Sequence, residues 1–160
     1  MNRRKSLGAL LIASGVLLVV ASTFLLVILP IMLKPTTNLL LGDGVFKAQV
    51  ALNDNERTVG LSGVTKLDPD QALIMAFPSE AKWQINIKAM KMPIDIVWLS
   101  VDKKIIYIVK GASPDSSSSD IFEPKLPAKY VIELPAGTVD SKVIKIDHMA
   151  IFQIDEGDIK

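Results

Sequence analysis

A run of 23 residues without a charged side chain, residues 7–29, constrains this 160-residue chain more than any other feature. As an α-helix rising about 1.5 Å per residue, the run spans roughly 35 Å, which exceeds the roughly 30 Å hydrocarbon core of a bilayer. A helix also satisfies its own backbone hydrogen bonds in lipid. Pro30 and Pro35 then close the apolar pattern. We therefore predict a basic cytoplasmic tail at residues 1–6 and a transmembrane helix at residues 7–33.

The basic residues near this run predict its orientation. Arg3, Arg4 and Lys5 precede the run, and only Lys34 closely follows it. By the positive-inside rule the N-terminus is cytoplasmic and the rest of the chain is extracytoplasmic, with the bilayer as partner of the helix. One alternative is a cleaved signal peptide with Val-Val-Ala at residues 19–21 as its site, although the apolar run exceeds the usual 7–15 residues. The other is a buried helix of a soluble domain, for which the run is long.

The composition of the chain excludes several classes of function. Lys and Arg number 18 against 17 Asp and Glu, and the formal net charge of +1 gives no support for a nucleic-acid partner. The absence of cysteine excludes disulfides, Cys-ligated metal sites and a thiol nucleophile. The single histidine, His148, excludes a multi-histidine metal site in a monomer and lies near no G-x-S-x-G motif. With no phosphate-binding glycine motif either, we expect no metal and no cofactor.

Beyond a predicted linker at residues 34–44, alternating apolar and polar residues predict a domain of short strands. The predicted strands lie at residues 46–52, 72–77, 83–87, 93–101, 105–109, 130–134 and 148–154. The fourth and fifth of these are predicted to form a hairpin. Short helices are predicted near residues 53–61, where Asn53 and Glu56 resemble a capping box, and near residues 138–143.

These elements predict an α+β fold, mainly antiparallel β: a small barrel-like domain of about seven strands and one or two short helices. The predicted domain covers residues 45–154 and is followed by a C-terminal tail at residues 155–160. A Pro- and Ser-rich segment at residues 111–127 is predicted to be a loop, either mobile in solvent or a lid over a site.

Two carboxylates lie inside predicted strands. Asp95 lies between Ile94 and Ile96, and Glu133 lies in the apolar strand at residues 130–134. A carboxylate among apolar neighbours must be paired, hydrogen-bonded or neutralised. Asp95 is therefore either a structural partner of backbone amides or of a lysine, or else a ligand-binding or catalytic group. If the two strands are neighbours, both carboxylates could share a cleft, as acid–base catalysis requires.

Three further side chains could complete a binding site. Lys88 is a possible ionic partner for Asp95. The rings of Trp98 and Tyr130 either pack in the core or form, beside the carboxylates, a platform for a sugar or peptide.

Several motifs together resemble the family known as domain of unknown function 192. They are Gly-Leu at residues 60–61, the apolar run at residues 72–77, Lys88 followed by Pro-Ile-Asp-Ile at residues 93–96, and AKYVIELPAG at residues 128–137. The resemblance covers about residues 45–152. It implies a small, mainly β, barrel-like α+β fold and frequent export or membrane attachment, and it implies no established activity.

The chain also departs from this family pattern at two places. Family members commonly carry Trp-Met-Lys-Asn before the Pro-x-Asp strand, whereas residues 86–89 here are Asn-Ile-Lys-Ala. Residues 147–148 are Asp-His, where the family usually has Gly-Asp. A site formed by those positions in relatives would be altered or lost in this chain.

We therefore expect a membrane-anchored extracytoplasmic binding module of the cell envelope, without catalytic activity. Its expected partner is a small polar ligand, an envelope glycan or a protein segment, bound by Asp95, Lys88, Trp98, Tyr130 and Glu133. One alternative is an envelope hydrolase in which Asp95 and Glu133 act as acid and base. Another is a structural role beside a membrane protein partner, recognised through an exposed apolar patch.

Overall fold

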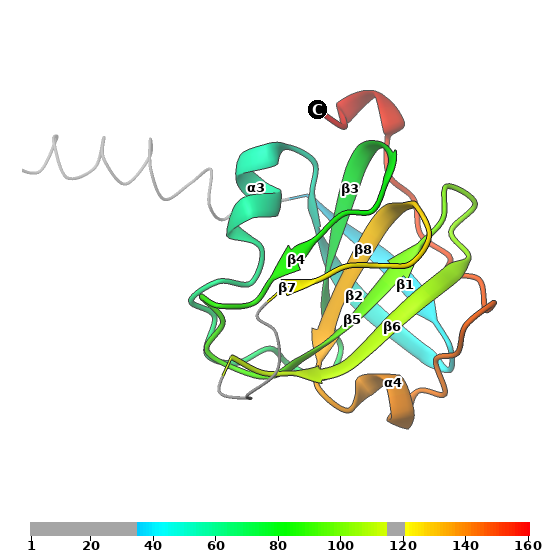
Figure 1. The fold of residues 1–160 in the computed structure, drawn as a ribbon. Helices are drawn as coiled ribbons and strands as arrows, with labels where there is room; N and C mark the ends of the chain where they lie inside the picture. The colour runs from blue at the N-terminus through cyan, green and yellow to red at the C-terminus, as the bar shows by residue number, and fades with distance from the viewer. Residues whose placement is uncertain (1–34, 115–120) are drawn as a thin grey trace, which may run out of the picture. The chain divides into compact units, whose positions relative to one another are not determined.

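The computed structural model describes residues 35–114 and 121–160 of the chain (Figure 1). The predicted transmembrane helix at residues 7–33 lies outside the described residues, as does part of the predicted loop at residues 111–127. Within the described ranges, no helix has the length and apolar character needed to cross a membrane.

A six-stranded sheet carries most of the fold, with the strand order β1-β2-β3-β8-β5-β6. Its strands are β1 (Thr36–Leu41), β2 (Gly44–Ala51), β3 (Gln71–Ala81), β8 (Ala128–Pro135), β5 (Ile94–Leu99) and β6 (Ile105–Ala112). Neighbouring strands are antiparallel except β2 and β3, which are parallel. The mainly antiparallel prediction is therefore confirmed.

The smaller elements lie beside this sheet. Strands β4 (Ile85–Asn86) and β7 (Ile121–Phe122) form a separate antiparallel pair (Figure 1). The helices are α3 (Asp54–Val59), α4 (Thr138–Ser141) and the 3-10 helix η2 (Glu156–Asp158). The two short α-helices and the β5–β6 hairpin agree with the sequence predictions, whereas β4 is much shorter than the strand predicted at residues 83–87.

The sheet does not close into a barrel, so the barrel-like part of the fold prediction is wrong. Strands β1 and β6 are its edges, and they do not pair with each other. The strand predicted at residues 148–154 consists only of isolated bridges, from Met149 to Lys104 beside β6 and from Ile151 to Leu40 in β1. The turn before it has a left-handed residue, Asp147, with φ of 71°, which breaks the extended path of the chain.

The predicted linker at residues 34–44 contains the edge strand β1. Leu39 and Leu41 are completely buried, whereas Leu40 between them is 43% exposed, which is the alternation of a strand with one buried face. Strand β1 pairs antiparallel with β2 from Thr36 to Leu41. The ordered domain therefore begins before residue 45, because the burial of two leucines outweighs the polar, turn-prone residues around them.

The N-terminus of α3 is capped as the sequence predicts. The Asn53 side-chain oxygen accepts a hydrogen bond from the Glu56 amide at 3.0 Å. The Glu56 carboxylate in turn accepts from the amide of Leu52 at 2.7 Å, one residue before the position of a standard capping box. The helix ends at Gly60, whose φ is +49°.

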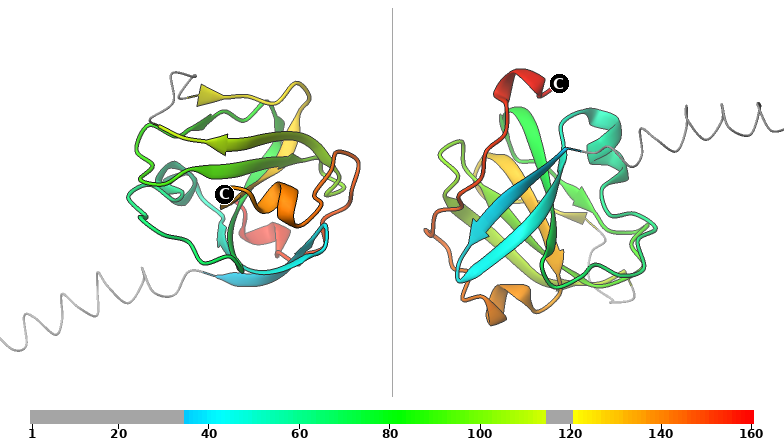
Figure 2. Two further views of the ribbon diagram at one scale, coloured as in Figure 1. Left: turned by 90° about the horizontal axis from the view of Figure 1, so that it is seen from below. Right: turned by 180° about the vertical axis from the view of Figure 1, so that it is seen from behind.

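The sheet has a hydrophobic cluster on each face. The first cluster includes Phe46, Ile74, Val97, Ile132 and Leu134 with α4 and the C-terminal segment. Strands β1 and β2 cross the other strands at a steep angle, so the sheet curls around this cluster (Figure 2). The second cluster includes Leu73, Met75, Ile87, Ile96 and Trp98 with the turn after α3. The candidate site lies on this second face.

Candidate functional site

Asp95 has a structural role in the fold. Its side chain is completely buried, and its two oxygens accept hydrogen bonds from the amides of Gly111 and Val139, each at 2.8 Å. The N-cap residue of α4, Gly137, has no side chain to perform this role. Asp95 therefore caps α4 from a neighbouring strand and holds the end of β6. Of the roles that the sequence leaves open for it, this is that of a structural partner of backbone amides.

The two strand carboxylates point to opposite faces of the sheet. In the antiparallel pair β5–β8, Asp95 lies opposite Leu134 and Ile96 lies opposite Glu133. Residues directly opposite each other share a face, and successive residues alternate between faces. Asp95 thus faces the first cluster, whereas Glu133 faces the second with Ile96. The alternative of an envelope hydrolase with paired carboxylates is wrong in its geometry, because the sheet separates the two groups.

The two aromatic candidates pack in the core and form no platform. Trp98 is completely buried and donates from its indole nitrogen to the carbonyl of Trp83 at 2.9 Å. Tyr130 is 1% exposed and donates from its hydroxyl to the Glu156 carboxylate. Burial, helped by the nearby Glu156, raises the pKa of the Tyr130 hydroxyl well above its ordinary value.

Lys88 is exposed and makes no ion pair with Asp95, whose oxygens are taken by backbone amides. It lines a pocket of about 360 Å³ together with Lys91, Pro93, Ser113 and Pro114. Of the five predicted site residues, only Glu133 lines a second pocket, which lies beside α3. The five residues therefore do not form one site.

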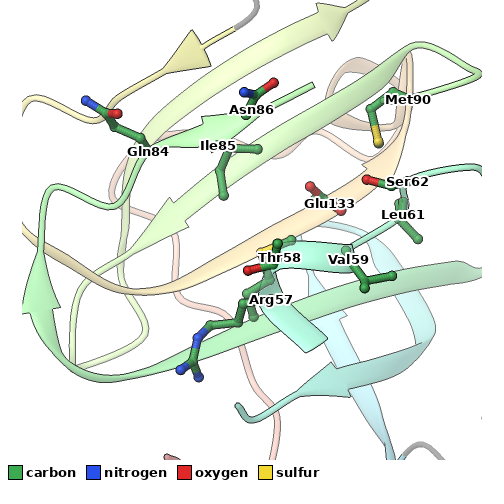
Figure 3. Close-up of a pocket in the computed structure, with 12 residues that line it drawn as sticks. Arg57, Thr58, Val59, Leu61, Ser62, Gln84, Ile85, Asn86, Met90 and Glu133 are labelled. Carbon is green, nitrogen blue, oxygen red and sulfur yellow. The ribbon is translucent and has the colours of Figure 1, made fainter. Parts of the chain in front are cut away.

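A pocket of about 240 Å³ opens on the second face of the sheet, beside Glu133 (Figure 3). One wall is the end of α3 and the turn after it, residues 57–62. Opposite lie residues 84–86, which include β4, and Met90. Met75 of β3 and Glu133 of β8 complete the lining. Figure 3 shows the Glu133 carboxylate pointing from β8 into the space among these residues.

Glu133 is buried and forms no ion pair with any residue in the described ranges. Its residue exposure is 2%, and its Oε2 has no hydrogen-bond partner among the described residues. Burial raises the pKa of this carboxyl to about 7, and a hydrogen bond from the Leu61 amide opposes part of that rise. An unpartnered buried acceptor is costly to a fold, so an oxygen of this kind beside a pocket marks a place where a ligand can supply the missing donor.

Arg57 lines the same pocket but does not pair with Glu133. Its guanidinium donates to the carbonyl of Ala76 at 2.7 Å, pairs with the carboxylate of Asp54 at 2.5 Å, and donates to the carbonyl of Lys160. Figure 3 shows the guanidinium directed away from Glu133. The arginine therefore fixes α3 against β3 and makes no ion pair with Glu133.

Gly60 brings the backbone of the turn close to the carboxylate. A Cβ built at this position would lie 2.9 Å from Cε of Met75 and 3.5 Å from Oε2 of Glu133. Its positive φ of +49° is also a conformation that other residues adopt only with strain. Glycine thus leaves room for both the carboxylate and the pocket.

Sequence reasoning identified Glu133 but missed the wall around it. In the sequence, the Gly-Leu pair at residues 60–61 carries only a family resemblance, and no pattern links it with Asn86 or Met90. The described residues contain no group of three or more His, Asp or Glu side chains that could hold a metal ion.

The fold and pocket define a class of protein: a small, mainly antiparallel β domain with one buried, unpaired carboxylate beside a pocket. A family model matches residues 38–151, that of DUF192, described as an uncharacterised ACR. The chain belongs to this family, which confirms the resemblance of its motifs. No curated protein matches the chain.

Two solved structures share the fold. One is from Sinorhizobium meliloti 1021 and is described as a "putative transcription regulator"; it has a TM-score of 0.66 and 24% identity, and the match covers 74% of this chain and 93% of that one. The other is a protein of unknown function from Novosphingobium aromaticivorans DSM 12444, with a TM-score of 0.65 and 17% identity, covering 74% and 84%. At these identities the likeness is one of fold.

Proposed function

We propose that this protein is a membrane-anchored binding module of the cell envelope, and that its pocket beside Glu133 holds a small polar ligand. The observation that carries the binding role is the buried Oε2 of Glu133, which has no hydrogen-bond partner among the described residues and lies beside a pocket of about 240 Å³. This volume is below the roughly 300–1,000 Å³ of pockets for drug-sized ligands. A small molecule or a single side chain therefore suits it better than an extended glycan.

The membrane arrangement in this proposal is supported by the sequence. The charge-free run at residues 7–29 is long enough to span a bilayer, and the basic residues Arg3, Arg4 and Lys5 precede it. The domain would then be extracytoplasmic, and its ligand would be a compound of the envelope or the surroundings.

The binding role is tested by thermal unfolding of the full chain in a mild detergent, against a panel of small amines, acids, sugars and neutral amides. A ligand at about 100 times its dissociation constant adds roughly 2.7 kcal/mol to the free energy of unfolding. We expect at least one compound to stabilise the native chain and to lose this effect in Glu133→Gln.

The matched control is Glu80→Gln, because Glu80 is an exposed carboxylate of β3 that accepts from the Val101 amide at 2.9 Å. This variant should respond to the ligand like the native chain. A compound that stabilises Glu133→Gln equally well binds elsewhere, and a panel without any stabilising compound would contradict a small-ligand site.

A further inference from the structure

We infer that the pocket beside Glu133 recognises an organic cation that carries N–H donors, either an alkylammonium or an alkylguanidinium group. This inference rests on the proposed binding role and names the chemical class of its ligand. It is carried by the unpartnered oxygen of Glu133, by the absence of a cation paired with it among the described residues, and by the shape of the pocket.

Within the part of the chain that the structure describes, the carboxyl group of this pocket has no positively charged partner. Glu133 is 2% exposed, and its Oε2 accepts no hydrogen bond among the described residues. The elements packed around it bring one other charged lining residue, Arg57, whose donors go to Ala76 and Asp54. The strand neighbours of Glu133, Leu73 and Ile96, are apolar. A cation with N–H donors would supply both the missing charge and the missing donor.

The walls of the pocket suit a short apolar stem behind such a charged group. Leu61, Met75, Ile85 and Met90 contribute apolar side chains to the lining, and the flexible thioether of methionine adapts its shape to a ligand. The side chains of Ser62, Gln84 and Asn86 are also in the lining. The oxygens of Ser62 and Gln84 are suitable acceptors for the remaining N–H groups of an ammonium or guanidinium, whereas that of Asn86 already accepts from the Lys88 amide at 2.9 Å.

The opposite chemistry would be a protonated Glu133 that donates to an uncharged ligand. Burial favours this neutral form and the Leu61 amide favours the ionised one, so the choice between the two chemistries is made by experiment. The two chemistries also predict opposite pH dependence. With a pKa of about 7 in the free protein, a cation binds more tightly as the pH rises through 7, whereas an uncharged acceptor binds less tightly.

The test is a titration of the full chain in detergent with n-butylammonium, followed by the NMR shifts of the Glu133 side-chain carboxyl and of the Gly60 and Leu61 amides. Butylammonium stays charged throughout the range used, like a lysine side chain. From a free-protein pKa of about 7, its affinity should be roughly 30-fold higher at pH 8 than at pH 5.5. Glu133→Gln should lose this binding, and Glu80→Gln should keep it.

Three comparison probes make the result specific. n-Butanol has the same stem without the charge, and tetramethylammonium has the charge without N–H donors, so both should bind at least tenfold more weakly. An acetylated tripeptide with a central lysine distinguishes a protein side chain from a free amine, since a site for free amines would bind it more weakly than butylammonium.

Several outcomes would overturn the inference. They are equal binding of n-butanol, an affinity for butylammonium that is unchanged or falls between pH 5.5 and 8, and equal binding by Glu133→Gln. If uncharged compounds bind in a Glu133-dependent way and amines do not, the binding role stands and the cation is wrong. If no compound of either kind binds, both the inference and the proposed pocket function fail.

Discussion

The Glu133 carboxyl lies inside the protein, and burial raises its pKa from 4.5 to about 7 against the smaller, opposing effect of the Leu61 amide. Between these two values the folded protein keeps a proton that the unfolded chain releases. Stability from this group is therefore fully present below pH 4.5, falls as the pH rises to about 7, and is constant above that. The expected loss is about 3 kcal/mol, from about 1.36 kcal/mol per pKa unit.

The measurement is urea unfolding of the native chain and of Glu133→Gln between pH 4.5 and 8. The variant cannot ionise at this position, so its stability relative to the native chain should rise by about 3 kcal/mol across that range. Parallel stability curves for the two proteins would show that Glu133 titrates normally in the folded state.

Replacing Asp95 should destabilise the fold, because both of its carboxylate oxygens accept hydrogen bonds from backbone amides. In Asp95→Asn the single amide oxygen can serve only one of the Gly111 and Val139 amides, and the new NH₂ group faces the other donor. We expect a loss of about 2–4 kcal/mol in the free energy of unfolding. Ligand binding beside Glu133 should be unchanged in the folded variant, and a loss of binding with little loss of stability would contradict the structural role.

The sequence indicated that both carboxylates are unusual but not which of them faces a pocket. An acidic residue inside an apolar strand must be satisfied or neutralised, and this reasoning applies equally to Asp95 and Glu133. Their difference depends on the pairing of β5 with β8, where Asp95 lies opposite Leu134. It also depends on Gly60, which approaches Glu133 from a turn more than 70 residues earlier in the chain. Neither relation is local in the sequence.

Among the elements, β1 gives the clearest test of the corrected domain boundary. Leu39 and Leu40 are adjacent leucines, but Leu39 is fully buried and Leu40 is 43% exposed. Leu39→Ala should lower the free energy of unfolding by about 2–4 kcal/mol, whereas Leu40→Ala should lower it by less than about 1 kcal/mol. Chemical denaturation measures both. Small and equal effects would indicate that this segment is a linker after all.

Two of the elements that the sequence predicted correctly are stabilised by near neighbours. The β5–β6 hairpin is closed by a four-residue turn with hydrogen bonds between Ser100 and Lys103 and between Ser100 and Lys104. The helix α3 is capped by Asn53 at its own start. By contrast, the parallel pairing of β2 with β3 and the pairing of β4 with a strand 35 residues later join segments that are well separated in the sequence. Periodicity within one segment carries no information about such partners.

At the scale of the whole molecule, the proposed topology is tested by introduced cysteines, because the natural chain has none. Val101→Cys places one thiol at a 47% exposed position of the β5–β6 turn, and Ser6→Cys places one in the basic tail without changing its charge. If the tail is cytoplasmic, a membrane-impermeant maleimide added to intact cells with a permeable outer envelope should label Val101→Cys alone. Both variants should react once the membrane is made permeable.

The same two variants separate the proposed anchor from its alternatives. If the anchor is not cleaved, Val101→Cys keeps its full length and stays in the membrane pellet after carbonate extraction. A cleaved signal peptide would release a labelled, shorter chain, because the segment ending near residue 21 would be removed. If the chain were soluble in the cytoplasm, both thiols would stay unlabelled in intact cells. After lysis, the chain would be found in the soluble fraction. Labelling of Ser6→Cys alone would reverse the predicted orientation and place the Glu133 pocket in the cytoplasm.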